Sequence, residues 1–271
     1  MSRAPLPFDL ELRPAGDWRF ELRSSPATRG RLLGGGLIAA SILSSAHTVD
    51  SDRMPASLHA SFLRAGHPGT TCGIEVRSLH DGQSSSVREV SILQHQRRLA
   101  TMTLRYHTEA QPPPSPWAHA AQDGSARPDQ GRADEAAVAP LEVLDGFEIR
   151  AAVLPESVKR PILHPYWVRS CAQIGDDPIM HAATLAFLSD IGVSGSALRP
   201  GTRMRRRLEA VTLDHLLTWY GPVRVDEWIR IEASPVINAE GRGLANGEIR
   251  TETGRLVAAL TQHVLLGERA E

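Results

Sequence analysis

The chain contains very little cysteine and carries almost no net charge. Cys72 and Cys171 are the two cysteines among 271 residues, and they lie far apart in the sequence. Such a sparse pair excludes a disulfide framework and forms no CxxC zinc motif, so we expect two reduced thiols. The formal net charge is -1 at pH 7. The sequence therefore has no overall basic field that would favour nucleic acid as a partner.

Long hydrophobic runs and aromatic residues are also scarce. No apolar run approaches the roughly 18 residues that a membrane-spanning helix needs, so no membrane insertion is expected. The segment Met1–Pro5 starts no apolar stretch of signal-peptide length, which predicts a cytoplasmic protein. Aromatic residues make up 5% of the chain and hydrophobic residues 41%. A core can therefore form without metals or disulfides, and a pocket for a bulky aromatic group is no more expected than an aliphatic one.

A proline-rich segment divides the chain into two nearly equal halves. Residues 109–140 contain Pro112-Pro113-Pro114 and Pro116, together with many alanine, glutamine, aspartate and glycine residues. Proline restricts the backbone, and the few large apolar side chains bury too little surface to offset the entropy of ordering. We interpret this segment as a linker between an N-terminal unit, residues 1–108, and a C-terminal unit, residues 141–271.

The two halves resemble each other. Phe20-Glu21-Leu22-Arg23 recurs as Phe147-Glu148-Ile149-Arg150. An alanine-rich apolar segment follows in each half, and its small and apolar residues predict a helix enclosed on all sides. These segments are residues 36–46 and 179–190. Alternating apolar residues then predict strands, at residues 58–63, 74–79, 86–93 and 99–106 and at residues 211–220, 228–233, 244–251 and 256–266.

Each half is therefore predicted to be one buried helix followed by an antiparallel sheet, which is an α+β architecture. A lone sheet with one helix would leave an apolar face and an open edge uncovered. Pairing the two halves covers both.

Short patterns at the ends of these elements carry a resemblance to a known family. In the second half they are Leu188-Ser189-Asp190, Val211-Thr212-Leu213-Asp214-His215, Pro222, Asp226-Glu227-Trp228, Arg255-Leu256-Val257-Ala258 and Thr261-Gln262. In the first half they are Gly34-Gly35-Gly36, Ser61-Phe62-Leu63-Arg64, Gly66, Asp81-Gly82, Ser84, Ser86 and Arg88. In their order and spacing these residues resemble the type II acyl-CoA thioesterases.

That resemblance implies both a fold and a reaction. The fold would be a double hotdog, with two long antiparallel sheets that each wrap a buried helix. The substrate would be an acyl-CoA thioester, hydrolysed by a catalytic trio of Asp190, Thr212 and Gln262 with neither a metal nor another cofactor. A homo-oligomer is a further expectation from the family.

The chain departs from the family pattern at three places. Gly36 stands where a glutamine usually follows the glycine pair. Tyr220 replaces a histidine near the end of the strand that contains Asp214-His215, and Gln262 is followed by His-Val where Glu-Gly is common. The trio itself is intact, so these changes bear on acyl-chain preference and rate.

Thioester hydrolysis needs a nucleophilic water, a base for its proton and donors for the developing oxyanion. Asp190 would accept the proton. Thr212 and Gln262 would position the water, because both side chains donate and accept hydrogen bonds. The N–H groups at a helix N-terminus are unpaired and carry partial positive charge, and glycine permits close backbone approach. We therefore expect Gly34, Gly35 and Gly36 to contact the substrate.

The internal repeat predicts one catalytic trio and not two. Alignment of the halves gives Ala46, Ser57 and Arg105 as the first-half counterparts of the trio. These residues supply neither a carboxylate nor an amide. The first half would therefore contribute shape and backbone donors.

Several alternatives stay open. A double-hotdog dehydratase or hydratase would need a histidine–aspartate pair that converges on one substrate carbon. A non-hydrolytic protein that binds acyl thioesters is a second alternative. Neighbouring strand residues point to opposite faces, so Asp214 and His215 are not expected to share a site, and one of them is interpreted as structural. A basic run could meet the phosphates of CoA or form a solvated loop; it comprises Arg203, Arg205, Arg206 and Arg207.

Overall fold

The computed structural model describes residues 6–28, 30–108, 142–151, 164–198 and 208–268. The predicted linker, residues 109–140, and the basic run, residues 203–207, lie outside the described residues. No helix in the described part of the chain is long and apolar enough to cross a membrane.

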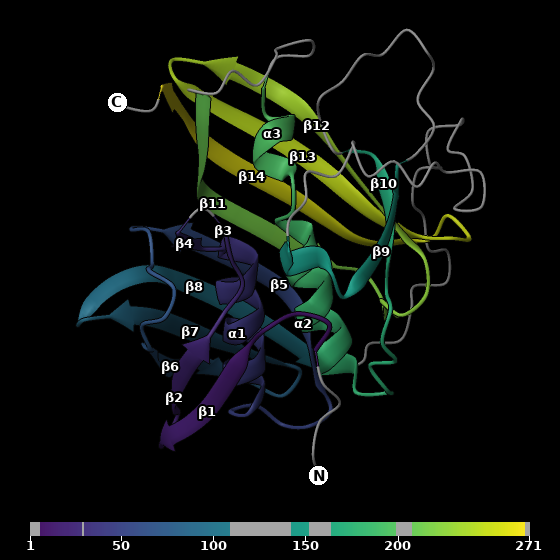
Figure 1. Ribbon diagram of the computed structural model, residues 1–271. Helices are drawn as coiled ribbons and strands as arrows, with labels where there is room; N and C mark the ends of the chain where they lie inside the picture. The colour runs from purple at the N-terminus through teal and green to yellow at the C-terminus, as the bar shows by residue number, and fades with distance from the viewer. Residues whose placement is uncertain (1–5, 29, 109–141, 152–163, 199–207, 269–271) are drawn as a thin grey trace, which may run out of the picture.

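A twelve-stranded antiparallel sheet spans both halves of the chain (Figure 1). In spatial order its strands are β1 (Glu11–Gly16), β2 (Arg19–Ser24), β6 (Cys72–Asp81), β7 (Ser85–Gln94), β8 (Arg97–Thr108), β5 (Arg53–Phe62), β11 (Leu208–Trp219), β14 (Leu256–Glu268), β13 (Arg242–Thr251), β12 (Ile229–Ala239), β10 (Tyr166–Ser170) and β9 (Phe147–Ala151). A separate two-stranded ribbon joins β3 (Ala27–Thr28) to β4 (Arg31–Leu32). The eight predicted strands are all present.

The description of two sheets, one in each half, needs correction, whereas the predicted pairing of the halves at their open edges is present. Strands β5 and β11 pair antiparallel through residues 57–61 and 214–218, so the two halves form one continuous sheet. The physical reason is the edge that each half-sheet would otherwise expose, because unpaired N–H and C=O groups favour pairing with another strand.

The helices also match the predicted positions. Helix α1 (Gly34–Ala46) and helix α2 (Pro178–Ser189) are buried almost all round and lie side by side against the sheet (Figure 1). Asp177 caps α2 by accepting a hydrogen bond from the Ile179 N–H, and Pro178 occupies the first helical turn, where proline is tolerated. A single turn of helix, α3 (Val193–Ser196), follows α2.

The repeated tetrapeptides do not occupy matching positions, which is a second correction. Phe20–Arg23 lies in β2, which pairs with both β1 and β6. Phe147–Arg150 lies in β9, the last strand at the opposite edge of the sheet. In the sheet order, β10 and not β9 is the counterpart of β2, because each is the second strand from its edge. The duplication is visible in the sheet order rather than in this short match.

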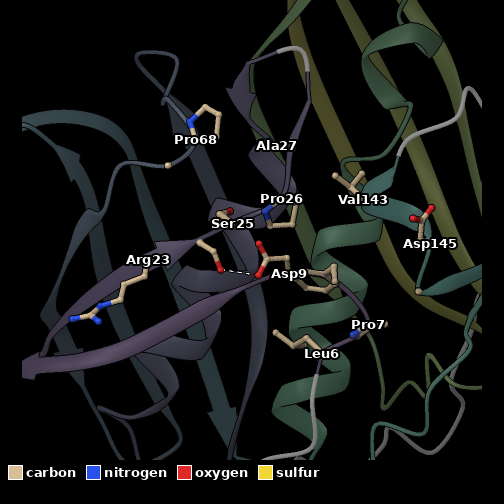
Figure 2. A pocket seen from close by; sticks show the side chains of 14 residues that line it. Leu6, Pro7, Asp9, Arg23, Ser25, Pro26, Ala27, Pro68, Val143 and Asp145 are labelled. Atoms are coloured by element: carbon tan, nitrogen blue, oxygen red, sulfur yellow. Dashed lines mark hydrogen bonds between the residues drawn. The ribbon is translucent and has the colours of Figure 1, made fainter.

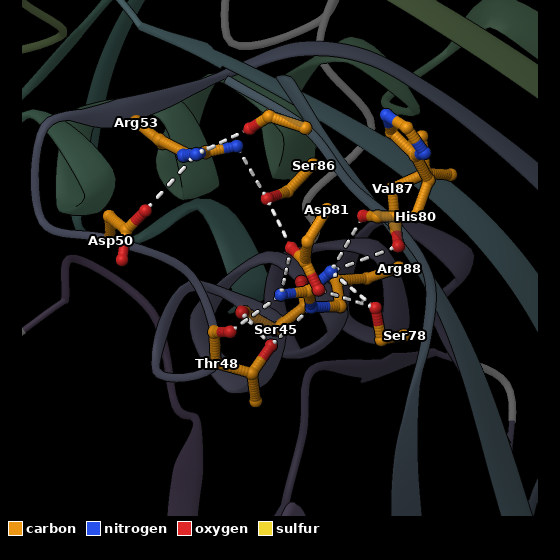
Figure 3. Close-up of polar contacts among 11 residues, drawn as sticks. Ser45, Thr48, Asp50, Arg53, Ser78, His80, Asp81, Ser86, Val87 and Arg88 are labelled. Atoms are coloured by element: carbon orange, nitrogen blue, oxygen red, sulfur yellow. Dashed lines mark hydrogen bonds and ion pairs between the residues drawn. The ribbon is translucent and has the colours of Figure 1, made fainter. Parts of the chain in front are cut away.

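A buried polar network braces the far end of α1 in the first half (Figure 3). The guanidinium of Arg88, 2% exposed, donates to the Thr48 carbonyl oxygen just beyond α1 and forms a 2.8 Å ion pair with Asp81. Ser78 and Ser86 donate further hydrogen bonds to the Asp81 carboxylate. These contacts hold β6 and β7 to the end of the helix, so family-typical residues of the first half have a structural role.

One hydrophobic core is shared by the two halves. Phe8, from the N-terminal segment, stacks on Phe187 of α2 with ring centroids 4.1 Å apart. Contacts of this kind tie the first half to the helix that ends at Asp190.

Candidate active site

The glycine-rich start of α1 meets the end of α2. Asp190 is the residue that ends α2, and its Oδ2 accepts a 2.7 Å hydrogen bond from the Gly35 N–H. A Cβ atom at Gly34 would lie 2.9 Å from Asp190 Oδ2, and one at Gly35 would lie 2.6 Å from the carbonyl oxygen of Phe187. Any larger residue would therefore push the two helices apart. Glycine is required here because of this close approach.

A β-bulge decides which residues of β11 face the two helices. The register between β11 and β14 shifts between Thr212 and Asp214, so Leu213 is the extra residue. Without this shift, Thr212 and His215 would lie on opposite faces, because strand side chains alternate. With the bulge, both side chains point inward, and His215 pairs directly with Gln262 of β14.

These inward side chains form a continuous chain of hydrogen bonds. Gln262 Nε2 donates to Thr212 Oγ1 over 2.8 Å. The Oε1 atom of the same amide lies 2.8 Å from His215 Nδ1. His215 Nε2 lies 3.0 Å from the hydroxyl oxygen of Ser189, the residue before Asp190. His215, Gln262 and Ser189 are fully buried, so each polar atom of the chain depends on its protein partner.

The electrostatics of this region favour a carboxylate that holds its proton more tightly than usual. Burial raises the pKa of Asp190 above its ordinary value, while His215, the Gly35 N–H and the Gln262 amide oppose that shift. Burial lowers the pKa of His215, with Asp190 and Gln262 opposing. A raised pKa lies closer to neutral pH, and a carboxylate with such a pKa accepts a proton more readily than an ordinary aspartate.

The structure brings together all three side chains of the predicted trio, from α2, β11 and β14. Sequence reasoning missed His215 and Ser189 as their neighbours. The alternation argument that separated Asp214 from His215 is confirmed, because Asp214 faces the opposite side and accepts a 2.7 Å hydrogen bond from Ser61. One available signal was that Gln262 was predicted to point inward. Its direct partner on the neighbouring strand is His215, so His215 also points inward.

The predicted glycine contacts have a more specific arrangement than expected. The Gly35 N–H is directed at the Asp190 carboxylate, so it orients that side chain. Leu37 N to Leu33 O is the first hydrogen bond within α1, which leaves the first-turn N–H groups without intrahelical acceptors. A Cβ at Gly36 would lie 2.5 Å from Ser25 Oγ, so the glutamine common in the family does not fit here.

The predicted first-half counterparts of the trio need correction. Strand β5 has its own register shift between Pro55 and Ser57. Matching this bulge to that of β11 makes Leu58 and its partner Leu104 the counterparts of His215 and Gln262. On this match Pro55 replaces the predicted Ser57 as the counterpart of Thr212, and Leu104 replaces the predicted Arg105 as the counterpart of Gln262. His47, which ends α1, replaces Ala46 as the counterpart of Asp190. The first half still supplies neither a carboxylate nor an amide.

An open groove lies between the N-terminal segment and the residues around Ser25, Pro68 and Val143 (Figure 2). Its volume is about 820 Å³, and Ser25, whose hydroxyl abuts Gly36, is part of its wall. The remaining lining residues are Leu6, Pro7, Phe8, Asp9, Arg23, Ser24, Pro26, Ala27, Pro68, Gly69, Val143, Asp145 and Gly146. None of the predicted trio lines this groove.

Within the described residues, no group of three or more histidine, cysteine, aspartate or glutamate side chains is placed to hold a metal ion. Cys72 and Cys171 are both free thiols, as predicted. Burial raises the pKa of Cys72 to about 11, which keeps that thiol protonated and unreactive at neutral pH.

Comparisons with solved structures define the class of protein. A hot dog fold protein of unknown function from Alicyclobacillus acidocaldarius superposes with a TM-score of 0.72 at 17% identity, covering 96% of this chain and 97% of the other. An acyl-CoA thioesterase II from Mycobacterium marinum superposes with a TM-score of 0.80 at 27% identity, covering 96% and 97%. The fold is therefore a hotdog fold.

Sequence comparisons define the family. Residues 23–107 match the acyl-CoA thioesterase N-terminal domain, and residues 109–266 match the acyl-CoA thioesterase C-terminal domain. Acyl-coenzyme A thioesterase 8 of Mus musculus is 27% identical over 258 residues, which cover 87% of this chain and 80% of that protein. The chain belongs to the acyl-CoA thioesterase family.

Proposed function

We propose that this protein hydrolyses acyl-CoA thioesters to a free acid and CoA, with Asp190 as the general base. The observation that carries the proposal is the convergence of Asp190, Thr212 and Gln262 at the glycine-rich start of α1. A half-buried carboxylate, a hydroxyl and an amide together can bind one water and remove its proton. Membership of the acyl-CoA thioesterase family supports the same reaction.

The mechanism follows from the positions of the groups. Asp190 takes a proton from the water, whose oxygen attacks the thioester carbonyl carbon. Thr212 and Gln262 hold the water, and such positioning can lower a barrier by several kcal/mol. The N–H groups of Gly34 and Gly36 are the proposed donors to the oxyanion, since the Gly35 N–H is directed at Asp190. When the tetrahedral intermediate collapses, the C–S bond breaks and protonated Asp190 returns its proton to the departing sulfur.

The proposed site is shared between the halves. The unit 1–108 supplies the start of α1, and the unit 141–271 supplies the trio. This division explains why a duplicated fold needs only one set of catalytic side chains. A cytoplasmic location and a homo-oligomeric state stay predictions.

The dehydratase or hydratase alternative is less compatible with the geometry. That chemistry needs a histidine that exchanges protons with a substrate carbon. Both ring nitrogens of His215 lie within hydrogen-bond distance of protein partners, Ser189 and Gln262. This arrangement leaves His215 no free nitrogen for a substrate.

The proposal is tested by thiol release from a panel of short, long and branched acyl-CoAs. Wild type, Asp190→Asn and Asp214→Asn are compared. Asparagine preserves the shape of Asp190 but cannot accept the proton, so we expect a loss of at least about 100-fold. Asp214→Asn is the matched control, because this carboxylate faces away from the site and is 39% exposed. Equal activity of Asp190→Asn and wild type would refute the assignment.

A further inference from the structure

We propose that His215 is a positioning residue that orients the Gln262 amide, by donating its Nδ1–H to Gln262 Oε1. The inference rests on the proposed roles of Asp190 and Gln262. It concerns a residue that neither contacts the reacting atoms in the proposed mechanism nor belongs to the predicted trio.

The orientation of an amide has to be set by its neighbours. The oxygen and nitrogen ends of glutamine have the same shape, so a half-turn exchanges a donor for an acceptor at almost no steric cost. Gln262 is fully buried between Thr212 and His215, at 2.8 Å from each. One end of the amide faces His215, and the other faces Thr212 and the Asp190 carboxylate.

The two tautomers of a neutral histidine have opposite consequences for that amide. With the proton on Nδ1, His215 binds the amide oxygen, and the NH2 group points to Thr212 and Asp190. With the proton on Nε2, the bare Nδ1 would attract the NH2 group instead. The amide oxygen would then face the ionised Asp190 carboxylate. The two groups would repel each other, and the carboxylate would lose the hydrogen bond from the amide N–H. A charged base at Asp190 is therefore compatible with the Nδ1–H tautomer.

Ser189 completes this arrangement on the other side of the ring. Its hydroxyl has both the Ala186 carbonyl oxygen, at 2.8 Å, and His215 Nε2, at 3.0 Å, within reach. Rotation of the hydroxyl proton toward the nitrogen satisfies Nε2 as an acceptor. Ser189 then donates to His215, His215 donates to Gln262, and Gln262 donates to Thr212. The hydroxyl of Thr212 accepts from the amide, so its own proton can point to the water.

In the described part of the protein, few charged or titratable groups lie around these hydrogen-bonded side chains. Asp190 faces His215 from the end of α2, and His59 acts on the ring from β5. Asp190 also faces Tyr166 of β10, whose pKa is raised by burial and by the carboxylate. A change at residue 215 therefore acts on Asp190 in two ways, directly through the ring and indirectly through the Gln262 amide that lies between them.

The test compares His215→Asn with His215→Leu. Asparagine places an N–H donor near the position of Nδ1, and leucine has nearly the same shape without a donor. We expect His215→Leu to lose about 10- to 100-fold in kcat with little change in KM. The acid limb of its pH–rate profile should move to higher pH, because Asp190 loses both the direct effect of the ring and the amide N–H. We expect His215→Asn to restore kcat to within about 5-fold of wild type and to return the acid limb part of the way, because it restores the orientation of the amide but not the ring. Thermal unfolding checks that both variants fold.

Two further measurements keep the inference separate from the proposed function. The ¹⁵N shifts of the ring, assigned by their loss in His215→Asn, report a protonated Nδ1 if the inference holds and a neutral Nε2–H tautomer if it fails. Gln262→Ala is assayed in parallel. If it retains full activity, the role of Gln262 itself is wrong. If Gln262→Ala is inactive while the leucine and asparagine variants share one kcat and one pH profile, only the positioning role is refuted.

Discussion

Replacing the Thr212 hydroxyl tests the proposed water site with the smallest change of shape. Thr212→Val keeps the branched side chain but removes the atom that accepts the 2.8 Å hydrogen bond from Gln262 Nε2. A buried donor left without a partner costs about 1–3 kcal/mol of folding stability. The hydroxyl also positions the water, and loss of one such group typically lowers kcat by about 10²- to 10³-fold.

Thr212→Ser is the matched control for this substitution. Serine keeps the hydroxyl and loses one methyl group, which costs about 0.8 kcal/mol of burial and allows the side chain more rotamers. We expect its kcat to stay within about 10-fold of wild type. The assays are steady-state thiol release and denaturant unfolding. Equal kcat values for the valine variant and wild type would show that Thr212 does not hold the water, whatever the effect on stability.

Three other predictions concern the helix contact, the base and the polar network. Gly35→Ala places a Cβ 2.6 Å from the Phe187 carbonyl oxygen, so we expect a loss of about 1–3 kcal/mol in denaturant unfolding together with reduced activity, whereas Gly195→Ala, with nothing within 4 Å, should be nearly neutral. Because burial raises the pKa of Asp190, the acid limb of kcat/KM should lie above the ordinary aspartate pKa of about 4, and a limb at or below that value would contradict a buried base. Asp81→Asn removes the counter-ion of the buried Arg88 guanidinium, and because Asp81 is 52% exposed, unfolding should show a loss of about 1 kcal/mol; an unchanged midpoint would mean that the network contributes little.

The sign of the pH effect at Asp81 follows from the lowered pKa of this carboxyl group, which its hydrogen bonds from Arg88, Ser86 and Ser78 cause. A group with a depressed folded-state pKa adds stability above its unfolded pKa and loses it as the pH falls toward the folded value. We expect wild-type stability to decline below about pH 4, and Asp81→Asn to show less of that decline. The Asp81 side chain is 52% exposed, so solvent screening makes this contribution modest.

The arrangement of the two halves explains why the chain keeps both. The first half has Leu58 and Leu104 at the positions of His215 and Gln262, so it offers no second polar cluster. Its contribution is the start of α1, where Gly34 and Gly35 allow the Asp190 carboxylate to approach backbone N–H groups. Either half alone would lack an essential part of the proposed site.

Much of the fold could be predicted from local patterns. The two enclosed helices and eight strands followed from apolar periodicity and small residues, and the trio followed from residue patterns that resemble a family. The short match between Phe20–Arg23 and Phe147–Arg150 was misleading, because similar half-buried strands favour similar residues wherever they lie in a sheet.

The rest was decided by tertiary structure. Period-two alternation predicts which strand residues share a face only until a bulge interrupts it, and the bulge at Leu213 is set by pairing with a strand some fifty positions later. That bulge turns Thr212 and His215 to one side and so assembles the polar chain. The single sheet depends on the pairing of β5 with β11, and the Asp190 carboxylate is held by the N–H of Gly35, 155 positions away. Sequence by itself determined which chemical groups are available, and only long-range pairing and packing decided which of them meet.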